Sequence, residues 1–578
     1  MSDSRARGPL TSFPLRGPAA LAIGMLVLLV VLVAAPLVLM FAISLLPNGV
    51  LSGEAPRLTF DHYIQLFADP VTWRLLLNTG AYTVGTIVSG LSIAFTLAWL
   101  MERTDLPGRS AFYSLMFVPM AIPPFATAAG WILLLGPNAG AINEWTRTLF
   151  GLEMTRGPFN IYSLWGMMFV TALAVAPSMW LLLIGVLRNM DPTLEEAGET
   201  AGLGRLTQLR HITLPLMLPG LLGIVALYAV IGIEIFEIPL AIGITAGVPV
   251  LSTRMFLLTA SSSTEPGNYG LAAAYGLLSV AVAVVFIVFY IRALRQSERF
   301  AVITGKGWRP KRISLGKWRY LAIGFVWSYL FLSAIMPFLI LLWSSLLRFY
   351  QVPSLEALQG LTILKYVELF QHRQIDRAAW NSLVVMFVTP TISILLAATI
   401  SWLIVRLRSG ISSALSVLSF LPLGIPGTVA ALGFLVLFIQ TPLYGTVALL
   451  IFAYVFRFLA FTTRLTNAAQ MQIDKSLDEA AITSGLSGVQ AFFFVNMKLM
   501  APALINGWLW VAVFSMRDFT FPLFLANFDS PVWANVVWQK FEEGGPSAAS
   551  PAVVVFVVFT VILTLLGKRW LRFGLERS

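Results

Sequence analysis

Long runs of apolar residues, separated by short polar segments, recur along the whole chain. A helix that crosses a bilayer needs about 20 predominantly apolar residues, and twelve runs in this sequence approach or exceed that length. They lie near residues 18–46, 75–101, 111–135, 161–187, 214–242, 269–294, 320–347, 381–406, 411–439, 447–470, 499–526 and 551–570. The pattern predicts an all-α polytopic membrane protein with about twelve transmembrane helices, six in each half of the chain.

The two halves also share individual residues at fixed spacings, which indicates an internal repeat. We call the spacing between Asn78 and Asn381 the early spacing, and the shorter one between Asp191 and Asp474 the late spacing. One insertion in an outer loop of the first half accounts for the change from one to the other. The further pairs are Trp99–Trp402, Pro119–Pro422 and Pro123–Pro426 at the early spacing, and Glu196–Glu479, Gly202–Gly485, Pro219–Pro502 and Pro239–Pro522 at the late spacing.

The number of crossings fixes how the repeats are related. Repeats with six crossings each run through the membrane in the same direction, which implies a pseudo-twofold axis along the membrane normal. We therefore expect two parallel six-helix repeats with a transport path on that axis.

Composition and charge restrict the class of protein further. Hydrophobic residues make up 58% of the 578 positions and charged residues only 11%, whereas soluble domains are roughly 25% charged. Basic residues crowd positions 292–319 with a single acid, Glu298, so the positive-inside rule places this segment and both basic termini in the cytoplasm. The basic excess is therefore no indication of nucleic-acid binding. We expect a cytoplasmic tail at residues 1–19, a first half at 20–294, a basic cytoplasmic linker at 295–319 and a second half at 320–578.

The residue types that metal centres and common catalytic sites need are scarce. The sequence has no cysteine, which excludes disulfides, thiolate metal sites and a cysteine nucleophile. The three histidines, His62, His211 and His372, lie far apart and lack metal-ligand spacing. No Gly-x-x-x-x-Gly-Lys-Ser/Thr loop occurs, so we do not expect this chain to hydrolyse ATP. We predict no catalytic residue, no metal site and no cofactor in this chain.

One polar motif occurs twice, each time in the predicted cytoplasmic loop between the fourth and fifth helices of a half. An aspartate five residues before each motif glutamate is a favourable N-cap, and the motif glycine is a favourable helix stop. Each loop should therefore be a short helix that ends in a tight turn. Such a rigid projection, present twice, is more than a connection between two helices requires. The motif residues are Glu196, Ala197 and Gly202 in the first loop, and Glu479, Ala480, Ala481 and Gly485 in the second.

The motif resembles a known signature. Glu-Ala-Ala, three residues, Gly, nine residues and Ile-x-Leu-Pro form the EAA signature of permease subunits in type I ABC importers. The first copy departs from it with Gly198 at the third position, and the second departs in its tail at residues 495–498. Residues 103–109 and 118–124, together with the fused length, resemble the ferric-iron and thiamine branch of that family.

The resemblance implies partners, a location and a cargo. Each motif would be a coupling helix seated in an ATPase subunit, with Glu196 and Glu479 at the contact. ATP and Mg²⁺ would belong to two copies of a separate ABC ATPase subunit, and a periplasmic or lipid-anchored solute-binding protein would deliver the substrate. The permease would lie in the bacterial cytoplasmic (inner) membrane. Iron(III) is the first expectation for the cargo, followed by thiamine, polyamines and phosphorylated or phosphonate compounds.

A secondary transporter with two six-helix parallel repeats, driven by an ion gradient, is the alternative from another class. Its sequence would show the same apolar pattern and the same internal repeat. The paired EAA loops argue against it, because an ion-driven transporter has no ATPase subunit to contact.

Five charged residues lie in the predicted fifth, tenth and eleventh membrane helices. A charge at a helix centre costs about 2.5–3.5 kcal/mol on insertion scales, so such residues usually face a cavity or a partner. At the late spacing Glu234 aligns with Arg517, which suggests opposite charges that face each other across the axis. A structural ion pair and a role in the path or its outer gate are equally consistent with the sequence. The five residues are Glu234, Glu237, Arg457, Arg517 and Asp518.

Overall fold

The computed structural model describes residues 16–47, 57–188, 197–198, 200–259, 267–300, 312–407 and 410–575. Within these ranges the regular secondary structure is helical, as the apolar runs predict. Among these described residues, nine helices are long and apolar enough to cross a membrane, and four further pairs, each bent by 76° to 108° at a short break, raise the number to as many as thirteen. The prediction of an all-α protein with about twelve membrane helices is confirmed.

The nine long spans carry most of the fold. They are Ala19–Ser44, formed by α1 (Arg16–Leu29), a π-helical turn and α2 (Ala35–Ser44), then α4 (Pro70–Arg103), α9 (Leu164–Arg188), α12 (Leu214–Glu234) with the π-helical turn that precedes it, α15 (Tyr269–Phe300), α16 (Arg319–Leu330) with α17 (Met336–Ser345), α19 (Ile375–Arg406), α22 (Val447–Met471) and α28 (Trp533–Leu575).

The bent pairs supply the remaining crossings. They are α5 (Arg109–Leu115) and α6 (Phe117–Ala121) with α7 (Pro124–Leu135), α13 (Ile244–Ala246) and its preceding turn with α14 (Leu251–Thr259), α20 (Gly410–Phe420) with α21 (Gly427–Phe438), and α24 (Gly488–Ala491) and α25 (Met497–Leu499) with α26 (Ala501–Arg517).

Two predicted helices end earlier than the apolar pattern suggests. The predicted run 214–242 stops at Glu234 and the run 499–526 stops at Arg517, because the backbones of Ile235 and Asp518 leave the helical conformation. A new helical segment begins after each break, one that starts at Pro239 and one, α27, that spans Thr520–Leu525. The apolar runs resume after each break, so the overall pattern predicts one helix, although charged residues and the equivalent Pro239 and Pro522 mark both places. The charged residues at these positions therefore lie at helix ends.

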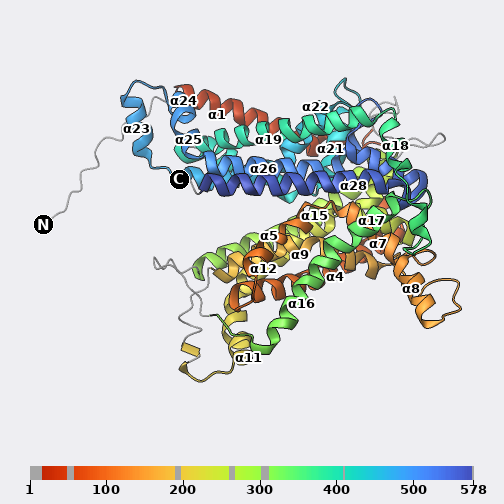
Figure 1. Ribbon diagram of the computed structural model, residues 1–578. Coiled ribbons are helices and arrows are strands. Elements are labelled where there is room, and N and C mark those ends of the chain that lie inside the picture. Colours follow the sequence, from red (N-terminus) through yellow and green to blue (C-terminus); the bar gives the residue numbers. More distant parts are fainter. Residues whose placement is uncertain are drawn as a thin grey trace.

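The first span of each half packs on the opposite half. In Figure 1, α1 runs beside α19 of the second half, and α16 runs along the part of the molecule formed by α4 and α9. Close approach at the crossings depends on glycine: a Cβ on Gly130 would lie 2.7 Å from Pro337, and one on Gly433 would lie 3.1 Å from Pro36. Small residues of this kind let membrane helices approach closely. The two halves are therefore interlocked rather than placed side by side.

The recurring asparagines serve the same purpose in both halves. Asn78 on α4 donates to the carbonyl of Pro249 at 3.1 Å, and Asn381 on α19 donates to the carbonyl of Pro531 at 2.9 Å. Each accepting carbonyl lies two residues before a helix, α14 or α28, so the asparagine fixes where that helix begins. Their recurrence at the early spacing is thus explained by equivalent hydrogen bonds.

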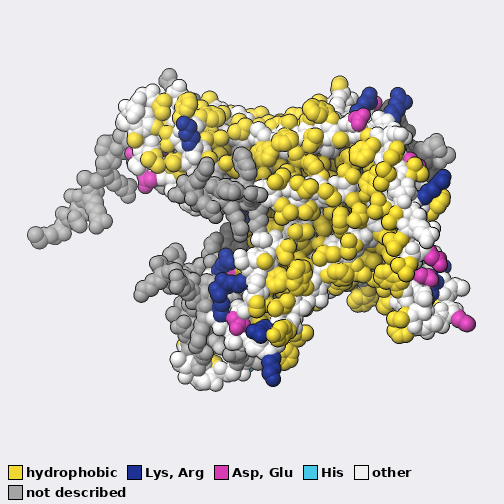
Figure 2. Space-filling model, in the orientation of Figure 1, with side chains coloured by type: hydrophobic (Ala, Val, Ile, Leu, Met, Phe, Trp, Pro, Cys, Tyr) yellow, Lys and Arg dark blue, Asp and Glu magenta, His cyan; other side chains and the backbone are white. Residues whose placement is uncertain are grey.

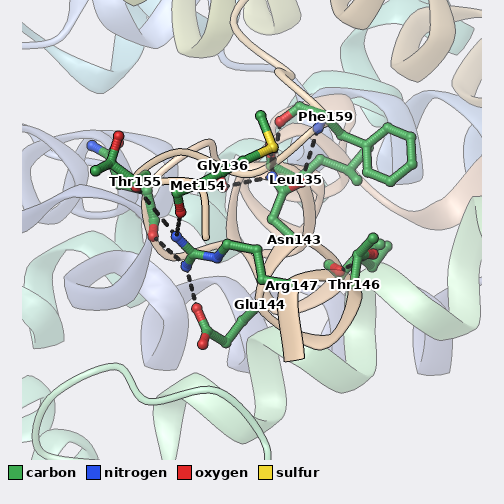
Figure 3. A network of polar contacts seen from close by, with 11 residues as sticks. Leu135, Gly136, Asn143, Glu144, Thr146, Arg147, Met154, Thr155 and Phe159 are labelled. Atoms are coloured by element: carbon green, nitrogen blue, oxygen red, sulfur yellow. Dashed lines mark hydrogen bonds and ion pairs between the residues drawn. The ribbon is translucent and has the colours of Figure 1, made fainter. Parts of the chain in front are cut away.

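The loop at residues 136–160, which accounts for the length difference between the halves, has its own polar core (Figure 3). The buried Asn143 on α8 (Ala141–Phe150) donates to three backbone carbonyls at 2.8 to 3.2 Å and accepts from the amide of Phe159 at 2.9 Å. Arg147 on the same helix binds Glu144 and the carbonyls of Met154 and Thr155. These bonds hold the loop, which only the first half possesses, in one conformation.

Candidate functional site

The second motif loop folds as the sequence predicts. Its helix, α23 (Lys475–Thr483), is N-capped by Asp474, whose carboxylate accepts from the amide of Ser476 at 2.8 Å. That hydrogen bond holds the pKa of the Asp474 carboxyl below its usual value. The turn after the helix contains Gly485 with φ +93°, and the amide of Leu486 bonds back to the carbonyl of Ala481 at 3.1 Å. Glycine is the residue that takes up this left-handed turn without strain.

The loop turns one side outward and anchors the other. Glu479, Ala480 and Gly485 are exposed, whereas Ala481 and the neighbouring Asp478 are buried. A rigid projection with Glu479 on its exposed side is available for contact with another protein.

The anchor is a buried ion pair that the motif does not contain. Asp478 lies 2.5 Å from Nε of Arg406 at the end of α19, and the two side chains are 3% and 7% exposed. Asn496 donates to the same carboxylate at 2.5 Å and accepts from Gln470 at 3.1 Å. Three elements are therefore joined to α23: the end of α19, the end of α22 and the π-helical turn that contains Asn496. Sequence reasoning missed this network.

A signal for the network was present in the repeat. Arg406 recurs as Arg103 at the early spacing, and Asp478 recurs as the acid Glu195 at the late spacing. A basic residue at one pair of equivalent positions and an acidic residue at the other could have indicated an ion pair in each half.

The first motif loop ends in the same turn. Gly202 has φ +75°, and the amide of Leu203 bonds to the carbonyl of Gly198 at 3.0 Å, which is equivalent to the bond between Leu486 and Ala481. Ala197 is exposed, as Ala480 is in the second loop. Glu196 and its predicted N-cap, Asp191, lie outside the described residues. Within the described part, the two loops share one geometry.

Both loops lie at the same end of the molecule. In Figure 1, α23 and α24 end one arm, and α11 (Arg205–Gln208) ends the other. The space-filling view is hollowed between these arms (Figure 2). The loop with α8 and the helix α18 (Leu364–Gln371) lie at the opposite end.

The five membrane charges that the sequence singled out line one cavity of about 290 Å³. The first repeat contributes two acids and the second repeat contributes two arginines and one acid. Tyr228, Ser178 and Thr171 add hydroxyl groups to the lining. The cavity thus lies between the two repeats. The charged residues are Glu234, Glu237, Arg457, Arg517 and Asp518.

The prediction that Glu234 faces Arg517 is wrong. Glu234 forms an ion pair with Arg457 on α22, not with Arg517. Arg517 instead donates to the carbonyl of Met120 on α6 and lies 4.7 Å from the ring centroid of Phe514. Glu234 and Arg517 do carry opposite charges at equivalent positions, but each contacts a different residue of the opposite repeat.

The ends of the broken helices explain these partners. The N-terminus of α21 lies beside Glu234, where a Cβ on Gly427 would come within 2.8 Å of the carboxylate. Arg517 binds a carbonyl at the C-terminal end of α6. A helix carries partial positive charge at its N-terminus and partial negative charge at its C-terminus, so each side chain matches the helix end that it meets. Both contacts join one repeat to the other.

The two remaining acids of the cavity differ in their surroundings. Asp518 accepts from the hydroxyl of Tyr454 at 3.1 Å and from the amide of Phe521 at 3.0 Å. Among the described residues, Glu237 has no ion-pair partner within 4.0 Å. The same part of the chain contains no group of three or more His, Cys, Asp or Glu residues that could hold a metal ion.

Two further cavities, of about 240 and 320 Å³, adjoin the charged one. All three share Phe514 on α26 in their lining, and the two further cavities also share Trp510. An aromatic residue that lines a cavity looks the same in the sequence as one that packs in an apolar helix. The sequence therefore predicted neither of these two cavities. The three cavities therefore lie along α26, at the interface between the repeats.

Three curated relatives align with most of the chain. A ferric transport system permease protein FbpB of Actinobacillus pleuropneumoniae is 26% identical over 82% of this chain and 68% of its own length. A putative ferric transport system permease protein FbpB 1 of Haemophilus influenzae is 28% identical over 82% of this chain and 76% of its own length. An Fe(3+)-transport system permease protein FbpB 2 of the same organism is 22% identical over 94% of this chain and 98% of its own length.

The family comparison covers both repeats. Residues 90–297 and residues 312–573 each match the family described as binding-protein-dependent transport system inner membrane component. These two segments make up more than half of the chain and correspond to the two halves that the internal repeat indicates. The chain therefore belongs to the family of binding-protein-dependent transport system inner membrane components, the permease subunits of ABC importers.

Proposed function

We propose that this chain forms the translocation path for iron(III) in an ATP-driven importer. The three relatives named above are ferric or Fe(3+) transport permeases, which supports iron(III) ahead of thiamine, polyamines and phosphorylated or phosphonate compounds. The observation that carries the proposal is the convergence of five charged side chains, from both repeats, on one cavity. An ion-gradient-driven transporter is not favoured, because the family depends on a binding protein.

The proposed assembly has three kinds of component. Two copies of an ABC ATPase subunit bind ATP and Mg²⁺, so the chain itself carries no cofactor. A periplasmic or lipid-anchored solute-binding protein delivers the cargo from the side opposite the motif loops. The chain lies in the bacterial cytoplasmic membrane with both termini and the linker at residues 295–319 in the cytoplasm, where their basic residues are favoured.

The motif loops are the proposed ATPase contacts. Glu196 and Glu479 face the two ATPase subunits, and the exposed Ala197 and Ala480 allow close approach beside them. The positive φ angles at the motif glycines fix the turn behind each helix. Because α23 is joined to α19 by a buried ion pair, a displacement of the loop passes to a membrane helix.

The charged contacts between the repeats are the proposed gate. The pair between Glu234 and Arg457 and the bond from Arg517 to Met120 both cross from one repeat to the other. Separation of the repeats has to break both contacts. Glu237 and Asp518 then remain as carboxylates that can face a cationic cargo.

Reconstitution in liposomes with the ATPase subunit and the binding protein tests the proposal. We expect uptake of radioactive iron(III) that requires both ATP and the binding protein. Uptake driven by an ion gradient without ATP contradicts the importer mechanism. ATP-dependent uptake of another ligand, with no uptake of iron, contradicts the cargo alone.

A further inference from the structure

Two short amphipathic helices, one in each repeat, lie at the end of the molecule opposite the motif loops. They are α3 (Asp61–Ala68) and α18 (Leu364–Gln371). Each precedes a long membrane helix, α4 or α19, and both lie outside the candidate membrane spans. Neither the family assignment nor the translocation path gives them a role.

Each helix presents an exposed apolar face, and the face recurs at the early spacing. Large apolar side chains lie at relative positions i, i+4 and i+7, where i is the N-cap residue directly before each helix, and such positions share one side of a helix. These side chains are between 41% and 68% exposed. A face that only one repeat possessed could be incidental, whereas its recurrence at each equivalent position indicates a common environment. The pairs are Phe60–Ile363, Ile64–Val367 and Phe67–Phe370.

The opposite face of each helix is fixed to the protein. Leu66 and its equivalent Leu369 are buried at 1% and 2% exposure. The hydroxyl of Tyr63 lies 2.8 Å from that of Ser44, and the hydroxyl of the equivalent Tyr366 lies 2.7 Å from that of Ser345.

A basic residue recurs beside each tyrosine and joins it in this anchoring. His62 bonds to the carbonyl of Leu46 at 2.9 Å. Its equivalent, Lys365, donates to the carbonyls of Ser344 and Ser547 at 3.0 and 2.9 Å. Neither helix can therefore roll to bury its apolar face against the protein.

The apolar face continues into the surface of the adjacent membrane helix. Trp73 and Leu77 on α4 are 54% and 73% exposed, and Trp380, the equivalent of Leu77 on α19, is 68% exposed. The indole of Trp73 also donates to the carbonyl of Phe67 at 3.3 Å. Exposed apolar side chains on a membrane-spanning helix face lipid, and tryptophan is enriched where lipid meets water.

We propose that α3 and α18 lie in the headgroup region of the leaflet opposite the motif loops, with these apolar faces inserted among the acyl chains. Amphipathic helices take up this position when one face is apolar and the other is polar. The two helices then fix the depth of each repeat in the bilayer. The occupant of the face is lipid, and the face is not a docking surface for the binding protein.

The absence of cysteine from the sequence allows a direct test on the full chain. Single cysteines at Ile64 and Val367 are labelled with a nitroxide after reconstitution into phosphatidylethanolamine and phosphatidylglycerol vesicles without any binding protein. Matched controls carry the label at Gln65 and Glu368, the next residues on the polar side of each helix. Collision with oxygen, which concentrates in lipid, is compared with collision with a water-soluble nickel chelate.

We expect the labels at Ile64 and Val367 to collide more with oxygen, and the two controls to collide more with the nickel chelate. Labels at Phe67 and Phe370 repeat the measurement one turn further along, and a monodisperse elution profile confirms that each variant is folded. Preferential collision with the chelate at Ile64 and Val367 overturns the proposal. Protection from the chelate that arises only after the binding protein is added also overturns it and identifies a docking surface instead.

Discussion

Removal of the Asp478 carboxylate tests how the second motif loop is held. In the variant Asp478→Ala, the guanidinium of Arg406 keeps its buried position, with 7% of its side chain exposed, but loses its counterion at 2.5 Å. Breaking a buried ion pair on one side costs about 3–5 kcal/mol, because an uncompensated charge remains. Asn496 also loses the acceptor at 2.5 Å.

This cost falls on the contact between the loop and the membrane helices, so we expect local opening of α23. At about 1.4 kcal/mol for each factor of ten, the opened population should rise on the order of a hundred- to several-thousand-fold. Hydrogen–deuterium exchange of the backbone amides at residues 475–483, followed by mass spectrometry on the purified chain, measures this population. Amides in the centre of α22 serve as an internal reference for global unfolding.

The matched control is Glu479→Ala, one residue along the same helix. Its side chain is exposed, and exposed substitutions usually change stability by about 0.5 kcal/mol or less. A double variant, Arg406→Met with Asp478→Leu, removes both charges and should recover much of the protection, because apolar residues often replace a buried pair without loss. Equal exchange in Asp478→Ala and Glu479→Ala refutes the argument that the buried pair holds the loop.

Four further outcomes follow from the structure. Gly485→Val should strain the loop by about 1–2 kcal/mol because φ is +93°, with no added clash since no neighbouring atom would meet the new Cβ; loss of stimulated ATPase activity measures the effect, and a fully stimulated variant contradicts it. Glu234→Gln should raise the basal ATPase rate of the reconstituted importer, and exchanging the charges of Glu234 and Arg457 should partly restore control; unchanged basal rates in folded variants reject the gate. Asn143→Ala should loosen the outer loop by about 1–3 kcal/mol, because several buried backbone groups lose their partner; limited proteolysis between residues 136 and 161 detects it, and wild-type resistance speaks against the network. A cysteine at Pro310 should react with impermeant maleimide only after the membrane is opened; labelling in intact cells contradicts the proposed orientation.

The membrane class, the number of helices and the repeat could all be predicted from sequence, because each depends on local properties. The thickness of the bilayer sets the length of an apolar run, and a duplicated half repeats its residues at a constant spacing. The turn at each motif glycine was also predictable: helix stops of this kind favour glycine, and both glycines have positive φ angles. The charged residues that line the cavity could be named in advance, because charge inside a membrane helix is costly and therefore conspicuous.

The tertiary structure decided which charged residues contact each other. Glu234 and Arg517 are equivalent in sequence, but the break after Glu234 places its carboxylate at the N-terminus of α21 beside Arg457, and the break after Arg517 points its guanidinium at a carbonyl of α6. The anchoring of α23 by Arg406, which is distant from Asp478 along the chain, has the same origin. The apolar pattern indicates which segments enter the bilayer, because burial in lipid depends on composition along the chain, but it does not show where a helix breaks. Pairing across an interface depends on where helices break and how the two repeats interlock, and no local pattern contains that information.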